Sequence, residues 1–127
     1  MQGPQVPPVS DEQVRRHVAA AKPHTLVVLT AGPKRDHPPA EVARIQAAHL
    51  RHLVGLVEGG ELLVNGPVLD ETSEVRGVSL YRSFDHELVR AWAAADPAVA
   101  AGRLTAHVLP WFGALPGDQP LPHNDQP

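Results

Sequence analysis

His49 is the residue of this sequence whose type and position most clearly suggest chemistry. It lies in the segment 38–58, whose apolar positions fall on one helical stripe with His49 at its centre: Val42, Ile45, Leu53 and Leu56. An imidazole there can act as a general base, because its free pKa is about 6.5. The same position also suits a buried histidine with one ring nitrogen satisfied by backbone or solvent. The pattern leaves both interpretations open.

His52 raises the alternative of a metal site. It follows His49 by three residues, so the two imidazoles are neighbours on the predicted helix. A metal ion would need at least one more protein ligand. His24, His107 or Asp96 could supply it, but no spacing selects any of them. We therefore predict no metal site, and the chemistry considered for His49 requires no cofactor.

Asp96 has a structural interpretation of its own. It precedes Pro97, a pair typical of a helix N-cap followed by proline in the first turn, and Gly102 would end that turn. The carboxylate could also orient an imidazole, because one oxygen can cap while the other accepts from a ring N–H. Spacing alone does not select His49 as its partner.

Residues of the predicted strands are candidates for binding a ligand. Ser79, Tyr81 and His107 are expected on the sheet face opposite the helices, where they could contact a ligand, pair across strands or fill an interface. Ser79 has no nucleophile-elbow context, so a serine triad is not predicted. Trp111 could form the wall of a pocket or of a dimer seam, and Gly66-Pro67 suits a tight turn better than a phosphate cradle. The candidate substrate-binding residues are Gly66, Pro67, Ser79, Tyr81 and Trp111.

The elements that must position these residues follow from apolar periodicity and from glycine and proline. The predicted strands are 24–30, 61–65, 75–82 and 104–111. Alternation is expected to place Leu62 and Val64 on one face of the second strand, and Leu104, Ala106 and Val108 on one side of the last. The predicted helices are 11–21, 38–58 and 85–95, with a single turn at 97–101. Apart from the first helix, the order is βαββαβ, which predicts a ferredoxin-like α+β fold. We expect one domain at 11–113 with its core at 24–112, a disordered N-terminus at 1–10 and a disordered proline-rich tail at 114–127.

Composition limits the function. The chain has 127 residues, a formal net charge of −3 and no cysteine, with acidic and basic residues interleaved. No basic patch suggests nucleic acid, and no apolar run reaches the ~20 residues of a membrane span. No signal peptide is apparent, so a cytoplasmic protein is expected.

The helices can cover only one face of the predicted sheet. The other face carries apolar residues that rarely remain in water. Pairing of this face with a second copy would bury them, so a two-fold homodimer is expected.

Several segments together resemble a known family. They are Ala48-His49-Leu50, the run from Gly59 to Pro67, Ala93 to Pro97, and a strand ending in Leu109-Pro110-Trp111. In order and spacing they resemble the YciI-like (YCII-related) proteins over about residues 24–112. The N-terminal helix, the loop at 34–37 and the proline-rich tail depart from the pattern.

This resemblance implies a dimeric α+β barrel with an active site made of a His and an Asp, which correspond to His49 and Asp96. Most members have no established reaction. One characterised branch eliminates chloride from a chlorinated hydroxyquinol, with the His–Asp pair as the suspected acid/base. We therefore predict a cofactor-independent enzyme that performs elimination or isomerisation on a small molecule. The alternatives are a non-catalytic ligand-binding or accessory protein and a metal-dependent enzyme.

Overall fold

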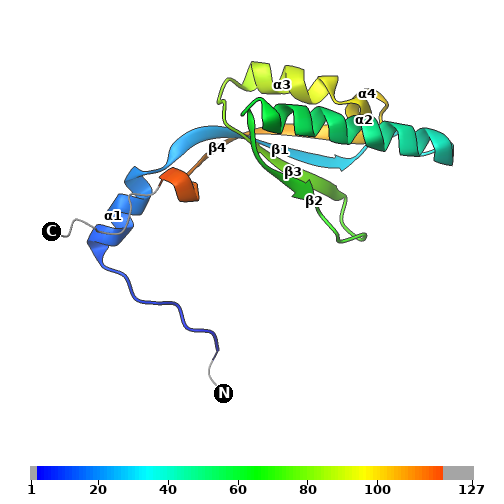
Figure 1. The fold of residues 1–127 in the computed structure, drawn as a ribbon. Coiled ribbons are helices and arrows are strands. Elements are labelled where there is room, and N and C mark those ends of the chain that lie inside the picture. The colour runs from blue at the N-terminus through cyan, green and yellow to red at the C-terminus, as the bar shows by residue number, and fades with distance from the viewer. Residues whose placement is uncertain (1–2, 119–127) are drawn as a thin grey trace. The chain divides into compact units, whose positions relative to one another are not determined.

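The computed structural model of the protein describes residues 3–118. The chain forms two compact units (Figure 1). The larger one, Pro23–Trp111, contains almost the whole sheet and is called the sheet unit here. The other combines Met1–Lys22 with Phe112–Pro127. In the part of the chain that is described, no helix is long and apolar enough to cross a membrane.

The observed elements follow the predicted order. The strands are β1 (Lys22–Ala31), β2 (Leu62–Pro67), β3 (Val75–Tyr81) and β4 (Leu104–Gly113). The helices are α1 (Asp11–Ala19), α2 (Pro39–Glu58), α3 (His86–Ala95), α4 (Pro97–Ala100) and the 3-10 helix η1 (Pro116–Asp118).

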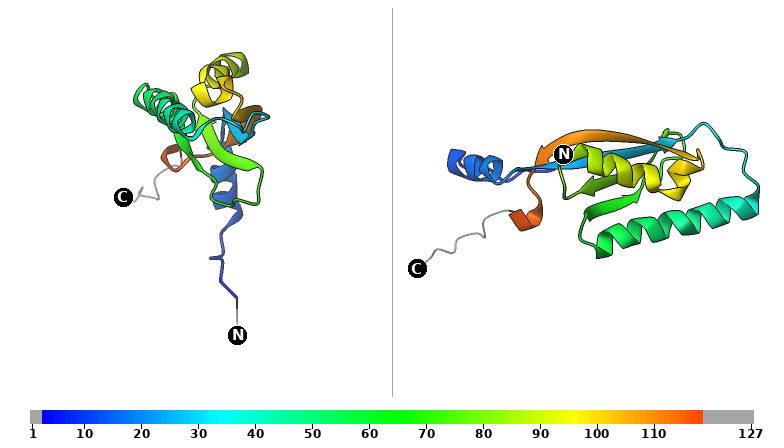
Figure 2. Two further views of the ribbon diagram at one scale, coloured as in Figure 1. Left: turned by 90° about the vertical axis from the view of Figure 1, so that its right-hand side faces the viewer. Right: turned by 90° about the horizontal axis from the view of Figure 1, so that it is seen from above.

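The four strands form one sheet in the order β2-β3-β1-β4. β3 is antiparallel to both β1 and β2. With the βαββαβ element order, this topology is ferredoxin-like, so the predicted fold class is confirmed. Within the sheet unit, α2, α3 and α4 lie over the same face of the sheet, and the views of Figure 2 show this layering from two directions.

The long helix α2 positions most of the site. It begins at Pro39, where the missing N–H of proline costs no hydrogen bond, and it ends at the C-cap Gly59. Its buried residues are Ile45, His49 and Leu53, which are four residues apart and therefore share one stripe. His49 is thus held on the side of the helix that faces the sheet.

The hydrophobic core lies between these helices and the sheet. Its buried cluster is Val27, Leu29, Leu53, Leu62, Tyr81 and Val89. The last strand alternates as predicted, since Leu104, Ala106 and Val108 pack against this cluster. Tyr81 is only 2% exposed and belongs to the cluster. Tyr81 therefore faces the helices, and the prediction that it lies on the opposite face is wrong.

A β-bulge in β2 corrects a second prediction. Leu62 pairs with Tyr81 and Val64 pairs with Leu80, so two steps along β2 match one step along β3. The bulge turns Leu62 into the core and leaves Val64 58% exposed. Leu62 and Val64 were predicted on one face, and that prediction is wrong.

The second unit, Met1–Lys22 with Phe112–Pro127, is called the terminal unit here, and it contains α1 and η1. Ser10 caps α1 with a capping box, in which its side chain accepts from Gln13 N and its own N–H donates to the Gln13 side chain. α1 ends at Ala19, two residues before the predicted end. Of the predicted tail at 114–127, residues 116–118 form η1, and residues 119–127 lie outside the described part of the chain.

Candidate active site

His49 and Asp96 form a close buried pair. His49 Nδ1 lies 2.7 Å from Asp96 Oδ2 and 2.9 Å from Asp96 Oδ1. The two residues are 9% and 3% exposed. A carboxylate accepts hydrogen bonds only, so Nδ1 donates its proton here, and Nε2 of the neutral ring is then an acceptor. The remaining ring nitrogen is thus ready to take a proton.

Asp96 also has the structural role that its sequence context suggested. It is the N-cap of α4, with Pro97 in the first turn, and its Oδ1 accepts from Ala98 N at 2.9 Å. The short helix begins there because the side chain satisfies a backbone N–H and proline suits the next position. The cap fixes the carboxylate in place, so the same bond that starts α4 orients the group that holds His49.

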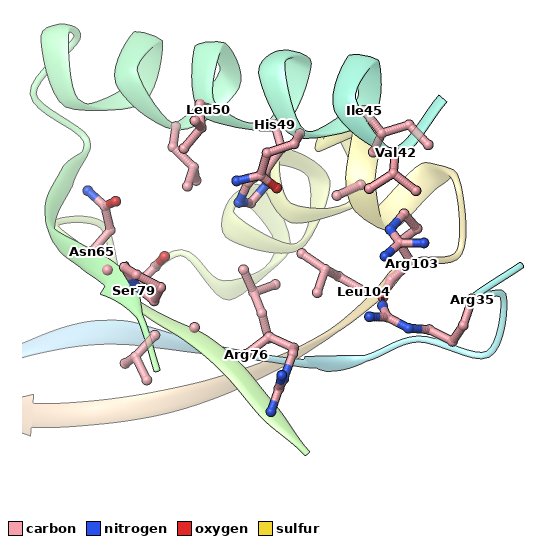
Figure 3. A pocket seen from close by; sticks show the side chains of 18 residues that line it. Arg35, Val42, Ile45, His49, Leu50, Asn65, Arg76, Ser79, Arg103 and Leu104 are labelled. Atoms are coloured by element: carbon pink, nitrogen blue, oxygen red, sulfur yellow. Dashed lines mark hydrogen bonds between the residues drawn. The ribbon is translucent and has the colours of Figure 1, made fainter. Parts of the chain in front are cut away.

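The imidazole of His49 points from α2 into a cavity of about 260 Å³ (Figure 3). The cavity lies between α2 and the strands β2 and β3. Of the candidate substrate-binding residues, Gly66, Pro67 and Ser79 line it. Ser79 is 3% exposed and shares the cavity with the helix residue His49, so it faces the helices and not the predicted opposite face.

Tyr81 is not among the residues that line this cavity. Its ring stacks on Trp92 of α3, with the centroids 5.9 Å apart. Burial, and secondarily the negative charge of Asp96, raise the pKa of Tyr81 to about 12. The phenol is therefore a neutral core group, and a direct contact with a ligand in the cavity is not part of this arrangement.

Trp111 and His107 belong to the other face of the sheet. The Trp111 ring lies 5.9 Å from the ring of His24, centroid to centroid. His107 Nε2 and Thr30 Oγ1 are 2.9 Å apart, and both residues lie on the strand positions that face away from the core. The predicted placement of His107 is therefore confirmed, and Trp111 is separated from His49 by the sheet.

His52 has a different partner from His49. Its Nε2 lies 2.9 Å from the backbone oxygen of Trp92, to which it donates. Within residues 3–118, no group of three or more His, Cys, Asp or Glu residues is arranged to hold a metal ion. The two imidazoles of α2 thus do not converge on a common point.

Among the polar residues at the two ends of the cavity, sequence reasoning proposed Ser79 but missed Asn65, Arg35 and Arg103. Asn65 and Ser79 lie at one end, and Arg35 and Arg103 lie at the other (Figure 3). Arg35 belongs to the loop between β1 and α2, and Arg103 follows Gly102 after the end of α4. Arg103 directly precedes β4, but Arg35 lies within the loop between β1 and α2, so no local signal along the chain indicates that the two arginines meet.

One similar solved structure is 5-chloro-2-hydroxyhydroquinone dehydrochlorinase from Burkholderia phenoliruptrix in complex with 2,5-dihydroxybenzoquinone. It is 22% identical, with a TM-score of 0.48, and the match covers 68% of this chain and 92% of that one. No curated protein matches the sequence. The family described as the YCII-related domain matches residues 17–111. The chain therefore belongs to the YCII-related domain family, as its sequence segments predicted.

Proposed function

We propose that this protein is a small-molecule enzyme in which His49 is the general acid/base and Asp96 orients it. One observation carries the proposal: His49 lines a cavity while its Nδ1 is bonded to a buried carboxylate at 2.7 Å. The carboxylate holds one tautomer and stabilises the imidazolium that forms when Nε2 takes a proton. The pair therefore needs only a substrate with an acidic C–H bond.

The proposed reaction is an elimination or an isomerisation. In an elimination, His49 Nε2 takes the proton from carbon, the C–H electron pair forms a new C=C bond, and the leaving group departs with its bonding electrons. In an isomerisation, the imidazolium returns the proton to a different atom of the same molecule. In the elimination the leaving group keeps the electron pair of the bond that breaks, and in the isomerisation the proton is returned, so neither reaction needs an oxidant or a reductant.

The test begins with proton exchange, because the substrate is not known. Small phenolic and lactone compounds are incubated with the protein in D₂O, and NMR follows the loss of C–H signals and the appearance of products. His49→Gln should slow any such reaction by about 10²–10⁴-fold, the usual contribution of a general acid/base. His52→Gln is the matched control, because it removes an imidazole one turn away that lies outside the cavity lining.

Two results would contradict the proposal. An unchanged rate in His49→Gln would exclude the histidine as the acid/base. Binding of several compounds with no exchange and no turnover would favour the alternative, a non-catalytic ligand-binding or accessory protein.

We also propose that the protein is a homodimer that pairs through the sheet face without helices. That face carries apolar side chains in contact with solvent: Val64 is 58%, Leu109 44% and Val78 38% exposed. Pairing around a two-fold axis would bury these side chains in both copies at once. Sedimentation at micromolar concentration should give twice the mass of one chain, and a monomeric mass would refute the dimer.

A further inference from the structure

The two ends of the cavity differ in charge. Asn65 and Ser79 are neutral, whereas Arg35 and Arg103 bring two cations to the opposite end (Figure 3). Arg76 also lines the cavity, but its guanidinium points away from His49 and donates to the backbone oxygens of Asp70, at 3.0 Å, and Ser73. The positive end of the cavity is therefore defined by Arg35 and Arg103.

Backbone contacts build this end of the site. Gly32 N donates to Arg103 O at 2.7 Å, and Lys34 N donates to Gly102 O at 3.0 Å. A side chain at Gly32 would collide with the backbone oxygen of Gly102, and Gly102 itself has a φ of +79°. Only glycine fits both positions without strain. The loop after β1 is thus pinned to the turn before β4, which places the two arginines side by side.

Hydrogen bonds orient the two guanidinium groups without neutralising them. Arg35 Nη1 donates to the backbone oxygen of Arg103. Arg103 Nη1 donates to His37 Nδ1 at 3.3 Å. Of the ion pairs formed within residues 3–118, none includes either arginine, and the nearby Asp36 carboxylate pairs with Lys34 at 3.0 Å.

The arrangement is electrostatically unfavourable as it stands. Burial lowers the pKa of Arg35 most, because desolvation disfavours the cation, and repulsion from the like charges of Arg103 and then Arg76 lowers this pKa further. A bound anion would reverse the effect of the like charges. Guanidinium groups donate in a fork that suits carboxylate and phosphate oxygens, with charge-assisted hydrogen bonds stronger than neutral ones.

We propose that the substrate of this site is a small organic anion whose carboxylate or phosphate group binds Arg35 and Arg103. Apolar side chains of Val42, Ile45 and Leu104 line the cavity near the arginines and His49 (Figure 3), so the body of the molecule is apolar. The volume of about 260 Å³ is below the ~300–1,000 Å³ of ordinary ligand pockets, so the molecule is small. This inference rests on the proposed function, because binding of the anionic group at the arginines would orient the reacting carbon of the substrate toward His49.

The experiment measures binding and requires no turnover. Benzoate, phenyl phosphate and benzyl alcohol are titrated into labelled protein, and NMR follows the His49 ring and the Ser79 amide. At least one of the two anions should bind about tenfold or more tightly than the neutral alcohol, because hydrogen bonds to a charged group are stronger than neutral ones. The tighter anion identifies the head group, and its affinity should fall as salt is added.

Variants assign the binding to the two arginines. Arg35→Gln and Arg103→Gln should each weaken binding of the preferred anion by about tenfold or more. Arg44→Gln is the matched control, because Arg44 is exposed on α2, pairs with Glu41 at 3.6 Å and does not line the cavity. The amide spectrum of each variant shows whether the fold is kept. If one substitution disturbs the loop, the other arginine variant provides the test of anion binding.

Three outcomes overturn the inference: equal binding of the alcohol and the anions, no shift with either anion at the highest soluble concentration, or unchanged anion binding in both variants. These outcomes are separable from failure of the proposed function. If the protein shows no turnover but anion binding persists in His49→Gln, the proposed enzymatic function is rejected and the anion site is retained. If the protein turns over neutral compounds but binds no anion, the anion site is rejected and the proposed enzymatic function is retained.

Discussion

His49 and His52 project from adjacent turns of one helix, yet their surroundings differ in kind. His49 faces a cavity and bonds through Nδ1 to the buried carboxylate of Asp96. His52 bonds through Nε2 to the backbone oxygen of Trp92, whose ring stacks on Tyr81 in the core. The two residues are of the same type and lie on the same helix, so neither feature distinguishes the surroundings of the two histidines.

The partner of each ring makes the difference. A backbone carbonyl can hold an imidazole in place, but it carries no net charge to stabilise an imidazolium. A carboxylate does both, and the cavity beside His49 lets a small molecule reach the other nitrogen. The contacts of His52 are therefore those of a packing residue, whereas the contacts of His49 are those that the proposed acid/base role requires.

Asp96→Asn tests this difference most severely. Asparagine can cap α4 as well as aspartate does, but its amide can donate to His49 Nδ1 and leave the proton on Nε2. The ring then cannot accept a proton from a substrate. We expect the stability to remain close to that of the wild type and turnover to fall by about 10²–10⁴-fold. Urea unfolding and NMR rate measurements on the same sample provide the two values.

Asp96→Ala is the control for the cap. It removes both roles, so it should lose activity and also about 1 kcal/mol of unfolding free energy. If Asp96→Asn kept full activity, the carboxylate would serve α4 alone, and the contrast between the two histidines would have no chemical meaning.

A second prediction concerns the core region around His52, where Tyr81 stacks on Trp92. Its pKa is raised from 10.0 to about 12, so the folded state keeps the phenol proton after the unfolded chain has lost it. This contribution is complete below pH 10 and is lost as the pH rises to about 12, by about 2 to 3 kcal/mol in total. The unfolding free energy should fall over that range, and less steeply in Tyr81→Phe.

The readout for Tyr81 is direct, because the chain has only one tyrosine and tyrosinate has its own ultraviolet absorbance. Asp96 is the second cause of the raised pKa of Tyr81, after burial. Asp96→Asn should therefore shift the titration of Tyr81 to lower pH. If the titration of Tyr81 were identical in the two proteins, the charge of Asp96 would have no effect on the pKa of Tyr81.

Local patterns were sufficient for much of the fold. The helical period placed Ile45, His49 and Leu53 on one buried stripe, and proline and glycine marked both ends of α2. These signals depend on neighbouring residues only, so they can be read without the tertiary structure. The proximity of His49 and Asp96 came from the family resemblance, because no local rule relates positions so far apart in the chain.

The parts that could not be predicted depend on long-range pairing. Strand alternation gives two faces but not which one meets the helices, so Ser79 and Tyr81 were placed on the wrong side. The bulge between Leu62 and Val64 places these two side chains on opposite faces of the sheet. The pairing of β2 with β3 determines where this bulge lies. The meeting of Arg35 and Arg103 depends on a backbone contact from Gly32 to Arg103. None of these three long-range pairings is visible along the chain.

Gly55→Ala gives the smallest expected effect and separates the stability of α2 from the chemistry of its histidines. Gly55 lies three residues after His52 in the interior of the helix, and a Cβ there would meet nothing within 4 Å. Alanine should therefore stabilise the protein by about 0.5–1 kcal/mol, because glycine loses more backbone entropy on folding. Urea unfolding measures the gain, while turnover and anion binding should stay at the wild-type level. A stabilised variant with reduced turnover would mean that the site depends on flexibility of the whole helix, and the distinction between His49 and His52 could then no longer be assigned to their partners alone.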